Sequence, residues 1–148
     1  MNIFQALRED HDLQRKLVDQ LIETHGDSDE RDQLFQRIKA ELKSHATAEE
    51  RCFYVPLMQH DMTQEMSRHS IAEHHEMDEM IEKLEKTEYS SSAWLVEAKN
   101  LQHRVHHHLD EEEHEAFQLA GKVLTEAQKT ALADDYHQEM TEQKTKSW

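Results

Sequence analysis

Two stretches of sequence decide the fold of this chain: HATAE at residues 45–49 and HLDEE at residues 108–112. In each of them a histidine stands four residues before a glutamate, His45 before Glu49 and His108 before Glu112. Four residues of an α-helix turn the chain by about 400° and rise about 6 Å, so the two side chains project from one face. Each pair can therefore hold one ion or form an ion pair.

The two stretches belong to a longer repeat with an offset of 63 residues. A further histidine stands 34 residues before each stretch, His11 before the first and His74 before the second. The same offset relates two more pairs, Glu50 with Glu113 and Tyr54 with Phe117. We interpret the repeat as two copies of one helical hairpin, each of which supplies two histidines and one carboxylate to a shared metal site.

The composition is typical of one small helical domain. Two glycines and one proline among 148 residues leave few places for turns, so long helices are expected. Hydrophobic residues make up 36% of the chain, a low share that suits a bundle with one narrow apolar stripe per helix. A bound metal ion would add stability to so thin a core.

Charge and cysteine content narrow the classes of partner and location. The formal net charge of −15 argues against nucleic acid or an anionic membrane as a partner. Cys52 is the only cysteine, which excludes an internal disulfide. The N-terminus has no basic region followed by an apolar run, and no stretch of about 18 apolar residues occurs. We therefore expect no membrane span and a location in the cytoplasm.

Apolar residues recur at alternating three- and four-residue steps along four segments, which predicts four long helices. We expect them over about residues 2–23, over 29–54, from 61 or 63 to the loop at 89–92, and over 92–119. Pro56 should end or kink the second helix, and Gly121 should break or bend the fourth.

A fifth, amphipathic helix is expected over residues 126–140, because Thr125 and Gln128 have the spacing of a capping box. The predicted fold class is all-α. Residues 1–122 should form an up-down-up-down four-helix bundle, with the short C-terminal helix and tail, residues 123–148, packed on the bundle or trailing from it.

In each of the four main helices the apolar stripe is interrupted at mid-height, by one histidine in the first and third helices and by a histidine and a glutamate in the second and fourth. The interrupting residues are His11, His45, Glu49, His74, His108 and Glu112. One such His–Glu pair is commonly a solvated surface pair. Six buried polar groups at matching levels need a shared partner, since an unpaired buried carboxylate is costly. Metal ions meet this need, because imidazole suits iron, copper, nickel or zinc and carboxylates can bridge two ions.

Neighbouring histidines offer alternative ligand sets. His107 with Glu111 has the same four-residue spacing, as does His103 with His107. His107 points about 100° away from the apolar stripe and has no histidine 63 residues before it, so we rank it below His108. His75 beside His74 has the same status. We assign the remaining candidates to the surface or to caps: His25, His60, His69 and His137.

Residues next to the six could orient them. Glu50 and Glu113 are interpreted as exposed, with hydrogen bonding to ligand histidines as the alternative role. Tyr54 is interpreted as a packing residue, with donation of a hydrogen bond or an electron as its alternative. Four apolar side chains should shield the site: Val18, Leu42, Ile81 and Val105.

At these positions the sequence resembles the haemerythrin-like HHE cation-binding domains, over roughly residues 3–120. That family has a histidine on the first helix, His-x-x-x-Glu on the second, Glu-His on the third and His-x-x-x-Glu on the fourth. This chain reads Asp10-His11, His45 to Glu49, Glu73-His74, and His108 to Glu112. The resemblance implies a four-helix bundle around a non-haem di-iron centre. The four histidines would be terminal ligands and the two glutamates bridging carboxylates.

One departure bears on function. Invertebrate oxygen carriers place two histidines four apart on the third helix, whereas Ser70 and Asp78 flank His74 at that spacing here. The set of four histidines and two glutamates is similar to that of bacterial HHE proteins linked to nitric oxide stress and iron-centre repair. Those repair proteins often carry a cysteine-bearing N-terminal domain, which is absent from these 148 residues. Repair activity is therefore not carried over from the resemblance alone.

We accordingly expect two iron ions, joined by an oxo or hydroxo bridge, that bind or react with dioxygen, nitric oxide or peroxide. Two histidines and two bridging carboxylate oxygens would give each iron four protein contacts, and the bridge a fifth, which leaves one position open. A redox partner is a further expectation. Two alternatives stay open: an iron storage, delivery or sensing protein without turnover, and a structural bundle with zinc or no metal.

Overall fold

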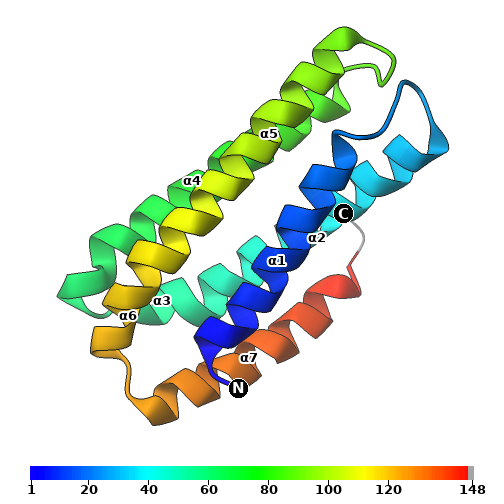
Figure 1. Ribbon diagram of the computed structural model, residues 1–148. Helices are drawn as coiled ribbons and strands as arrows, with labels where there is room; N and C mark the ends of the chain where they lie inside the picture. The colour runs from blue at the N-terminus through cyan, green and yellow to red at the C-terminus, as the bar shows by residue number, and fades with distance from the viewer. Residues whose placement is uncertain (147–148) are drawn as a thin grey trace.

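Figure 1 shows the computed structural model, which describes residues 1–146. All regular structure in this range is helical, and two single turns of π-helix, η1 and η2, interrupt the α-helices. The elements in chain order are α1 (Ile3–Leu21), α2 (Asp29–Glu49), η1 (Glu50–Tyr54), α3 (Val55–Leu57), α4 (Asp61–Glu85), α5 (Ser92–Glu111), η2 (Glu112–Ala116), α6 (Phe117–Val123) and α7 (Glu126–Lys144).

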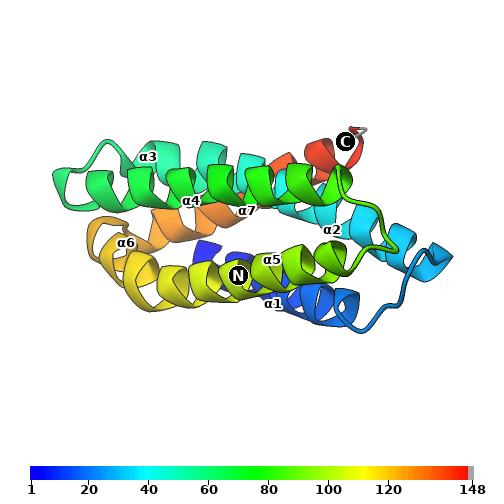
Figure 2. The ribbon, with the colours of Figure 1, turned by 90° about the horizontal axis from the view of Figure 1, so that it is seen from above.

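Four long helical segments form an elongated bundle, as the sequence predicts (Figure 1). Two of them are single helices, α1 and α4, and the other two are composite, running from α2 through η1 to α3 and from α5 through η2 to α6. Helix α1 packs on α2 and α5, and α4 packs on α5 (Figure 2). Helix α7 packs on α1 and α2. The expected all-α bundle with a further C-terminal helix is confirmed.

Local signals in the sequence account for most helix ends. The side chains of Ser28 and Ser91 cap α2 and α5 by accepting backbone N–H bonds. Thr125 and Gln128 form the expected capping box at the start of α7. Helix α7 continues to Lys144, four residues beyond the predicted end at residue 140.

Gly121 does not break the fourth helical segment, so of the two predicted effects, a break or a bend, the break is wrong. Helix α6 runs through it to Val123, and the chain turns into extended backbone only at Leu124. A glycine inside a helix costs about 1 kcal/mol relative to alanine, which does not stop a helix held by its neighbours. Ala120 is buried on the same segment and anchors it. Pro56 lies in the short helix α3, which ends at Leu57, so the expected helix end lies one residue past the proline.

Two apolar cores divide the interior. The first core is nearer the loops at residues 22–28 and 86–91, and includes the four shielding residues that we expected, Val18, Leu42, Ile81 and Val105. The second core is nearer the N-terminus and α3, and includes Leu7, Phe53, Leu57, Phe117 and Tyr136. Between the two cores lies a layer of buried histidine and glutamate side chains.

Arg31 of α2 connects two loops at one end of the bundle, residues 22–28 and 86–91. Its buried guanidinium donates hydrogen bonds to the carbonyl oxygen of Thr24 and to that of Tyr89, each at 2.6 Å. The same group lies 4.4 Å from the ring centre of Trp94, within the range of a cation–π contact. One side chain therefore joins the loop after α1 to the loop after α4.

Within residues 1–146, no helix combines the length and the apolar character needed to cross a membrane.

Candidate metal centre

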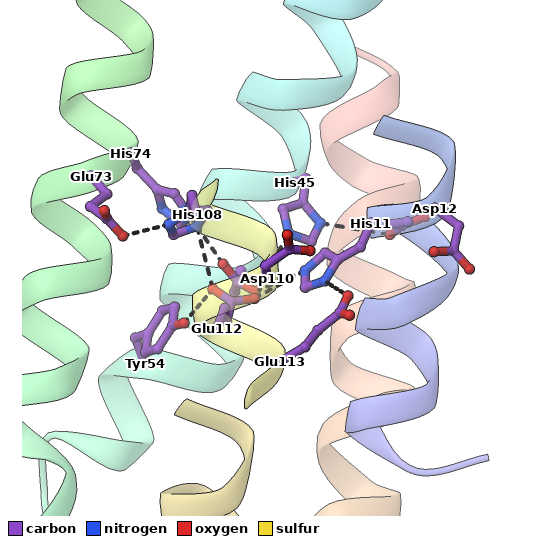
Figure 3. A network of polar contacts seen from close by, with 12 residues as sticks. His11, Asp12, His45, Tyr54, Glu73, His74, His108, Asp110, Glu112 and Glu113 are labelled. Carbon is purple, nitrogen blue, oxygen red and sulfur yellow. Dashed lines mark hydrogen bonds and ion pairs between the residues drawn. The ribbon is translucent and has the colours of Figure 1, made fainter. Parts of the chain in front are cut away.

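The four helical segments bring all six predicted side chains together in the layer between the cores. Figure 3 labels the four histidines and Glu112. Each of the six residues is at most 4% exposed. Helix α1 supplies His11, α2 supplies His45 and Glu49, α4 supplies His74, α5 supplies His108, and η2 supplies Glu112. The ligand atoms form two groups of four, and within each group all atoms lie within 4.8 Å of one another. One group contains the histidine pair His11 and His45, and the other contains the pair His74 and His108. Both groups contain Glu49 and Glu112.

Each glutamate directs one oxygen toward each histidine pair. Glu49 Oε2 lies 3.4 Å from His45 Nε2, while Glu49 Oε1 lies 3.1 Å from His74 Nε2. Glu112 Oε1 lies 3.0 Å from His11 Nε2, while Glu112 Oε2 lies 3.4 Å from His108 Nε2. Both carboxylates thus lie between the two pairs in the arrangement of a bridge.

The outward ring nitrogens explain why the inward ones point to the centre. Three histidines contact a carboxylate through Nδ1: His11 with Glu113 at 2.7 Å, His74 with Glu50 at 2.8 Å, and His108 with Glu73 at 2.8 Å. A carboxylate accepts hydrogen bonds, so Nδ1 carries the proton in each ring. When the proton at Nε2 is displaced by a metal ion, the neutral imidazole presents a lone pair at Nε2, which is the form that binds metal ions.

His45 is held differently, through a residue of α7. Its Nδ1–H donates to the hydroxyl of Tyr136 at 2.6 Å, and that hydroxyl donates to Asp10. Asp10 is the repeat counterpart of Glu73, 63 residues earlier, but its side chain is one methylene shorter. Asp10 Oδ2 lies 3.8 Å from His45 Nδ1, which is too far for a direct hydrogen bond. The Tyr136 hydroxyl forms hydrogen bonds with both groups and so connects them. Tyr136 could not be predicted from the repeat, because α7 lies outside it.

Glu50 and Glu113 orient the histidines, so the alternative role is confirmed and the assignment to an exposed face is wrong. Their side chains are 30% and 17% exposed, respectively. Glu113 also accepts a hydrogen bond from Arg15 at 3.1 Å. Burial would raise the pKa of Glu113, but its bonds with His11 and Arg15 outweigh this and lower the pKa to about 2. Their relation by the 63-residue offset was the signal for this role.

Tyr54 makes the two halves of the site unequal. Its hydroxyl donates a hydrogen bond to Glu112. Burial and the charges of Glu112 and Glu49 raise the pKa of Tyr54 well above 10, so the phenol stays protonated as a donor. The repeat counterpart of Tyr54 is Phe117, which has no hydroxyl and instead stacks on the His11 ring. Tyr54 therefore has two of the roles considered for it: it packs in the interior and donates a hydrogen bond.

The two π-turns adjoin the two glutamates. The first begins immediately after Glu49, and the second begins at Glu112. Single π-turns are frequent at functional sites because they change the direction of side chains within a helix. Here the first π-turn places both Phe53 and Tyr54 in the buried interior. Apolar periodicity does not report an inserted residue of this kind, so the sequence analysis did not predict it.

The competing histidines lie outside the centre. The side chain of His107 is 58% exposed and pairs with Glu111 at 3.2 Å. His75 and His103 are exposed, and so are three of the residues that we assigned to the surface or to caps: His25, His69 and His137. His60 is the N-cap residue of α4. The register with His108 inward and His107 outward agrees with the prediction.

Several buried polar atoms of the centre have no hydrogen-bond partner within the described part of the chain, which is the condition in which a metal ion would stabilise them. Buried atoms with no hydrogen-bond partner among residues 1–146 include seven in the centre: Nε2 of the four histidines, both carboxylate oxygens of Glu49, and Glu112 Oε1. Lone pairs of nitrogen and oxygen face one another there, which is costly unless a cation or protons lie between them. Imidazole and carboxylate together suit divalent transition metals.

Comparison with known proteins agrees with this geometry. The family model described as the Hemerythrin HHE cation binding domain matches residues 2–120. A crystal structure of a Hemerythrin HHE cation binding domain-containing protein from Mycobacterium kansasii, a homologue of Rv2633c, has a similar fold, with a TM-score of 0.89. It is 23% identical in sequence, and the alignment covers 98% of this chain and 88% of that chain. A comparison with curated proteins finds no match. The chain belongs to the haemerythrin HHE cation-binding domain family.

Proposed function

We propose that this chain is a cytoplasmic non-haem di-iron protein that binds or reacts with a small ligand: dioxygen, nitric oxide or peroxide. His11 and His45 hold one ion, His74 and His108 hold the other, and Glu49 and Glu112 bridge them. The observation that carries the proposal is that each glutamate offers one oxygen to each histidine pair. Two ions satisfy this arrangement, whereas a single ion would leave one pair unpartnered.

The chain's own residues prepare the site. Two iron ions joined by an oxo or hydroxo bridge would supply redox chemistry and an open coordination position. The acceptors at Nδ1 fix the direction of each imidazole, and the hydroxyl of Tyr54 fixes one oxygen of Glu112. The apolar cores on both sides limit the access of water. A redox partner would supply electrons for any turnover.

A groove between α4 and the η2–α6 segment offers the small ligand a path. This α4–η2 groove has a volume of about 430 Å³, and Glu112 and Ser70 are part of its wall. Ser70 is buried, and it is one of the two positions, with Asp78, at which a second histidine four residues from His74 would stand. A serine is smaller than a histidine and leaves room beside the centre. Met66 and Ala116 make part of the same wall apolar, which suits uncharged diatomic molecules.

The first experiment is to load metal-free protein anaerobically with Fe²⁺, count the bound iron, and expose the reduced protein to dioxygen, nitric oxide or peroxide. We expect two iron ions per chain and a new visible absorption band with at least one of the three ligands. Rapid consumption of peroxide would identify an enzyme, and a stable adduct would identify a carrier or sensor. Reversible iron release without either would replace the proposal by iron storage or delivery.

Tyr136→Phe is expected to weaken metal binding at one of the two positions. Loss of the hydroxyl leaves His45 Nδ1 without its acceptor, and losses of this kind typically lower metal affinity by about 10–100-fold. Titration of metal-free protein with Co²⁺ should therefore show one ion bound normally and one bound weakly. Tyr89→Phe is the matched control, because it removes a tyrosine–aspartate bond of 2.7 Å far from the centre. Identical Co²⁺ affinities in Tyr136→Phe and Tyr89→Phe would contradict the role of Tyr136.

The metal-free protein is expected to lose thermal stability between pH 7 and pH 10. Burial would lower the pKa of His74 and His108, but hydrogen bonds with neighbouring glutamates outweigh it and raise these values to about 10 and about 9. Stabilisation by a raised histidine pKa is complete below the unfolded value, about 6.5, and is lost as the pH passes the folded value. Metal-loaded protein should keep its melting temperature over this interval, because bound imidazoles are already neutral. If the melting temperature changes with pH in the same way with and without metal, the prediction is contradicted.

A further inference from the structure

A second cluster of metal-binding residue types lies on the wall of the α4–η2 groove. His69, Glu73 and Glu111 each offer one ligand atom, and the three atoms lie within 4.8 Å of one another. His69 Nε2 lies 2.9 Å from Glu111 Oε1 and 3.6 Å from Glu73 Oε1. The side chain of His69 is 56% exposed, while that of Glu73 is 7% exposed. The cluster therefore extends from the solvent to the interior of the bundle.

The same groove reaches a carboxylate of the candidate metal centre. Glu112 is part of the groove wall and is 2% exposed, and its Oε1, which has no hydrogen-bond partner among residues 1–146, lies 3.0 Å from His11 Nε2 in the candidate metal centre. A buried carboxylate oxygen in this condition is stabilised by a positive ion, because burial without a partner is costly. The groove thus connects the partly exposed cluster with the candidate metal centre.

Glu73 links the cluster to the candidate metal centre. Its Oε1 accepts a hydrogen bond from His108 Nδ1 at 2.8 Å and also faces His69. Arg104 Nη1 lies 4.0 Å from Glu73 Oε2, so one positive charge is already close to the cluster. A cation beside this guanidinium is repelled as well as attracted, which favours weak and reversible binding.

We propose that His69, Glu73 and Glu111 form a third divalent-cation site, weaker than the centre, through which metal ions pass on their way inward. One imidazole and two carboxylates suit Fe²⁺, Mn²⁺ or Zn²⁺. The net charge of −15 raises the local concentration of cations at the surface. The destination of the ions rests on the proposed function, whereas the existence of the third site does not.

Metal-free protein titrated with Co²⁺ tests the proposal, with equilibrium dialysis for the number of ions and stopped-flow absorption for the loading rate. We expect two tight ions and one weak ion in the wild type. His69→Ala and Glu111→Gln should keep the two tight ions, lose the weak one, and load roughly tenfold more slowly. Glu73 stays unchanged because it holds His108. Glu115→Gln is the matched control, since Glu115 is part of the same groove wall but not of the cluster.

A weak ion that persists in both variants would overturn the third site. Its role in metal passage would be overturned by loading rates equal to that of the wild type, or by an equal slowing in Glu115→Gln. The last result would mean that diffuse negative charge, and not coordination, attracts the metal. Fewer than two tight ions in the wild type would contradict the proposed function instead. Anomalous scattering from Co²⁺-soaked crystals then decides the third site by itself: a peak at His69 Nε2 supports it, and its absence overturns it.

Discussion

His108→Ala is expected to abolish most of the increase in melting temperature that metal gives this protein. At a free metal concentration one hundred times Kd, binding stabilises a protein by about 2.7 kcal/mol. For a chain of this size each 1 kcal/mol corresponds to roughly 2–4 °C, so the metal-dependent increase should be about 5–11 °C in the wild type. His108 is a buried member of one histidine pair, so its loss should leave at most one ion bound.

The quantity to compare is the difference in melting temperature with and without metal, since alanine at a buried position also destabilises the fold by itself. His107→Ala is the control on the same helix, because the side chain of His107 is mostly exposed. It should keep both bound ions and the full temperature difference. An empty centre in His107→Ala together with a filled one in His108→Ala would show that the assigned register of α5 is wrong.

Arg31→Ala is expected to destabilise the protein by about 3–5 kcal/mol without changing the number of bound metal ions. The substitution leaves the carbonyl oxygens of Thr24 and Tyr89 without their donor and removes the cation over the Trp94 ring. Denaturant unfolding of the metal-free protein measures the change, so that metal binding does not contribute. The corresponding fall in melting temperature is roughly 6–20 °C.

Arg37→Ala on the same helix is the control, because Arg37 is exposed. Its effect should be within about 0.5 kcal/mol of zero, as for most surface substitutions. Arg31→Lys should lie between the two, since lysine keeps the charge but not the planar fork that reaches both loops. Similar unfolding midpoints for Arg31→Ala and Arg37→Ala would mean that the loop contacts contribute little.

Sequence patterns predicted the bundle because its information is local and periodic. The apolar stripe has the period of a helix, and His11, His45, His74 and His108 interrupt it at one height. The 63-residue offset added a second, independent constraint on the same positions. Together these signals were sufficient to place the six polar side chains in one layer of the structure.

The partners of those side chains were harder to predict, because they depend on contacts between helices. Glu50 and Glu113 lie at the edge of the apolar stripe, where pattern alone indicates a solvated face. Tyr136 reaches His45 from a helix 91 residues later in the chain, and no periodicity relates the two. The π-turns change the register after Glu49 and from Glu112 on, which a fixed period of 3.6 residues does not represent.

The division of the interior into two apolar cores has a consequence for how the protein opens. When chelation removes the metal, the side chains of the histidine layer are joined by ion pairs and hydrogen bonds alone, while the helices continue through the layer from the first core to the second. The amides on either side of that layer should then exchange with deuterium at two separate rates, as two units that unfold independently. When metal is restored, the two rates should merge into one, because the ions bind side chains from all four helical segments and couple both halves of the bundle.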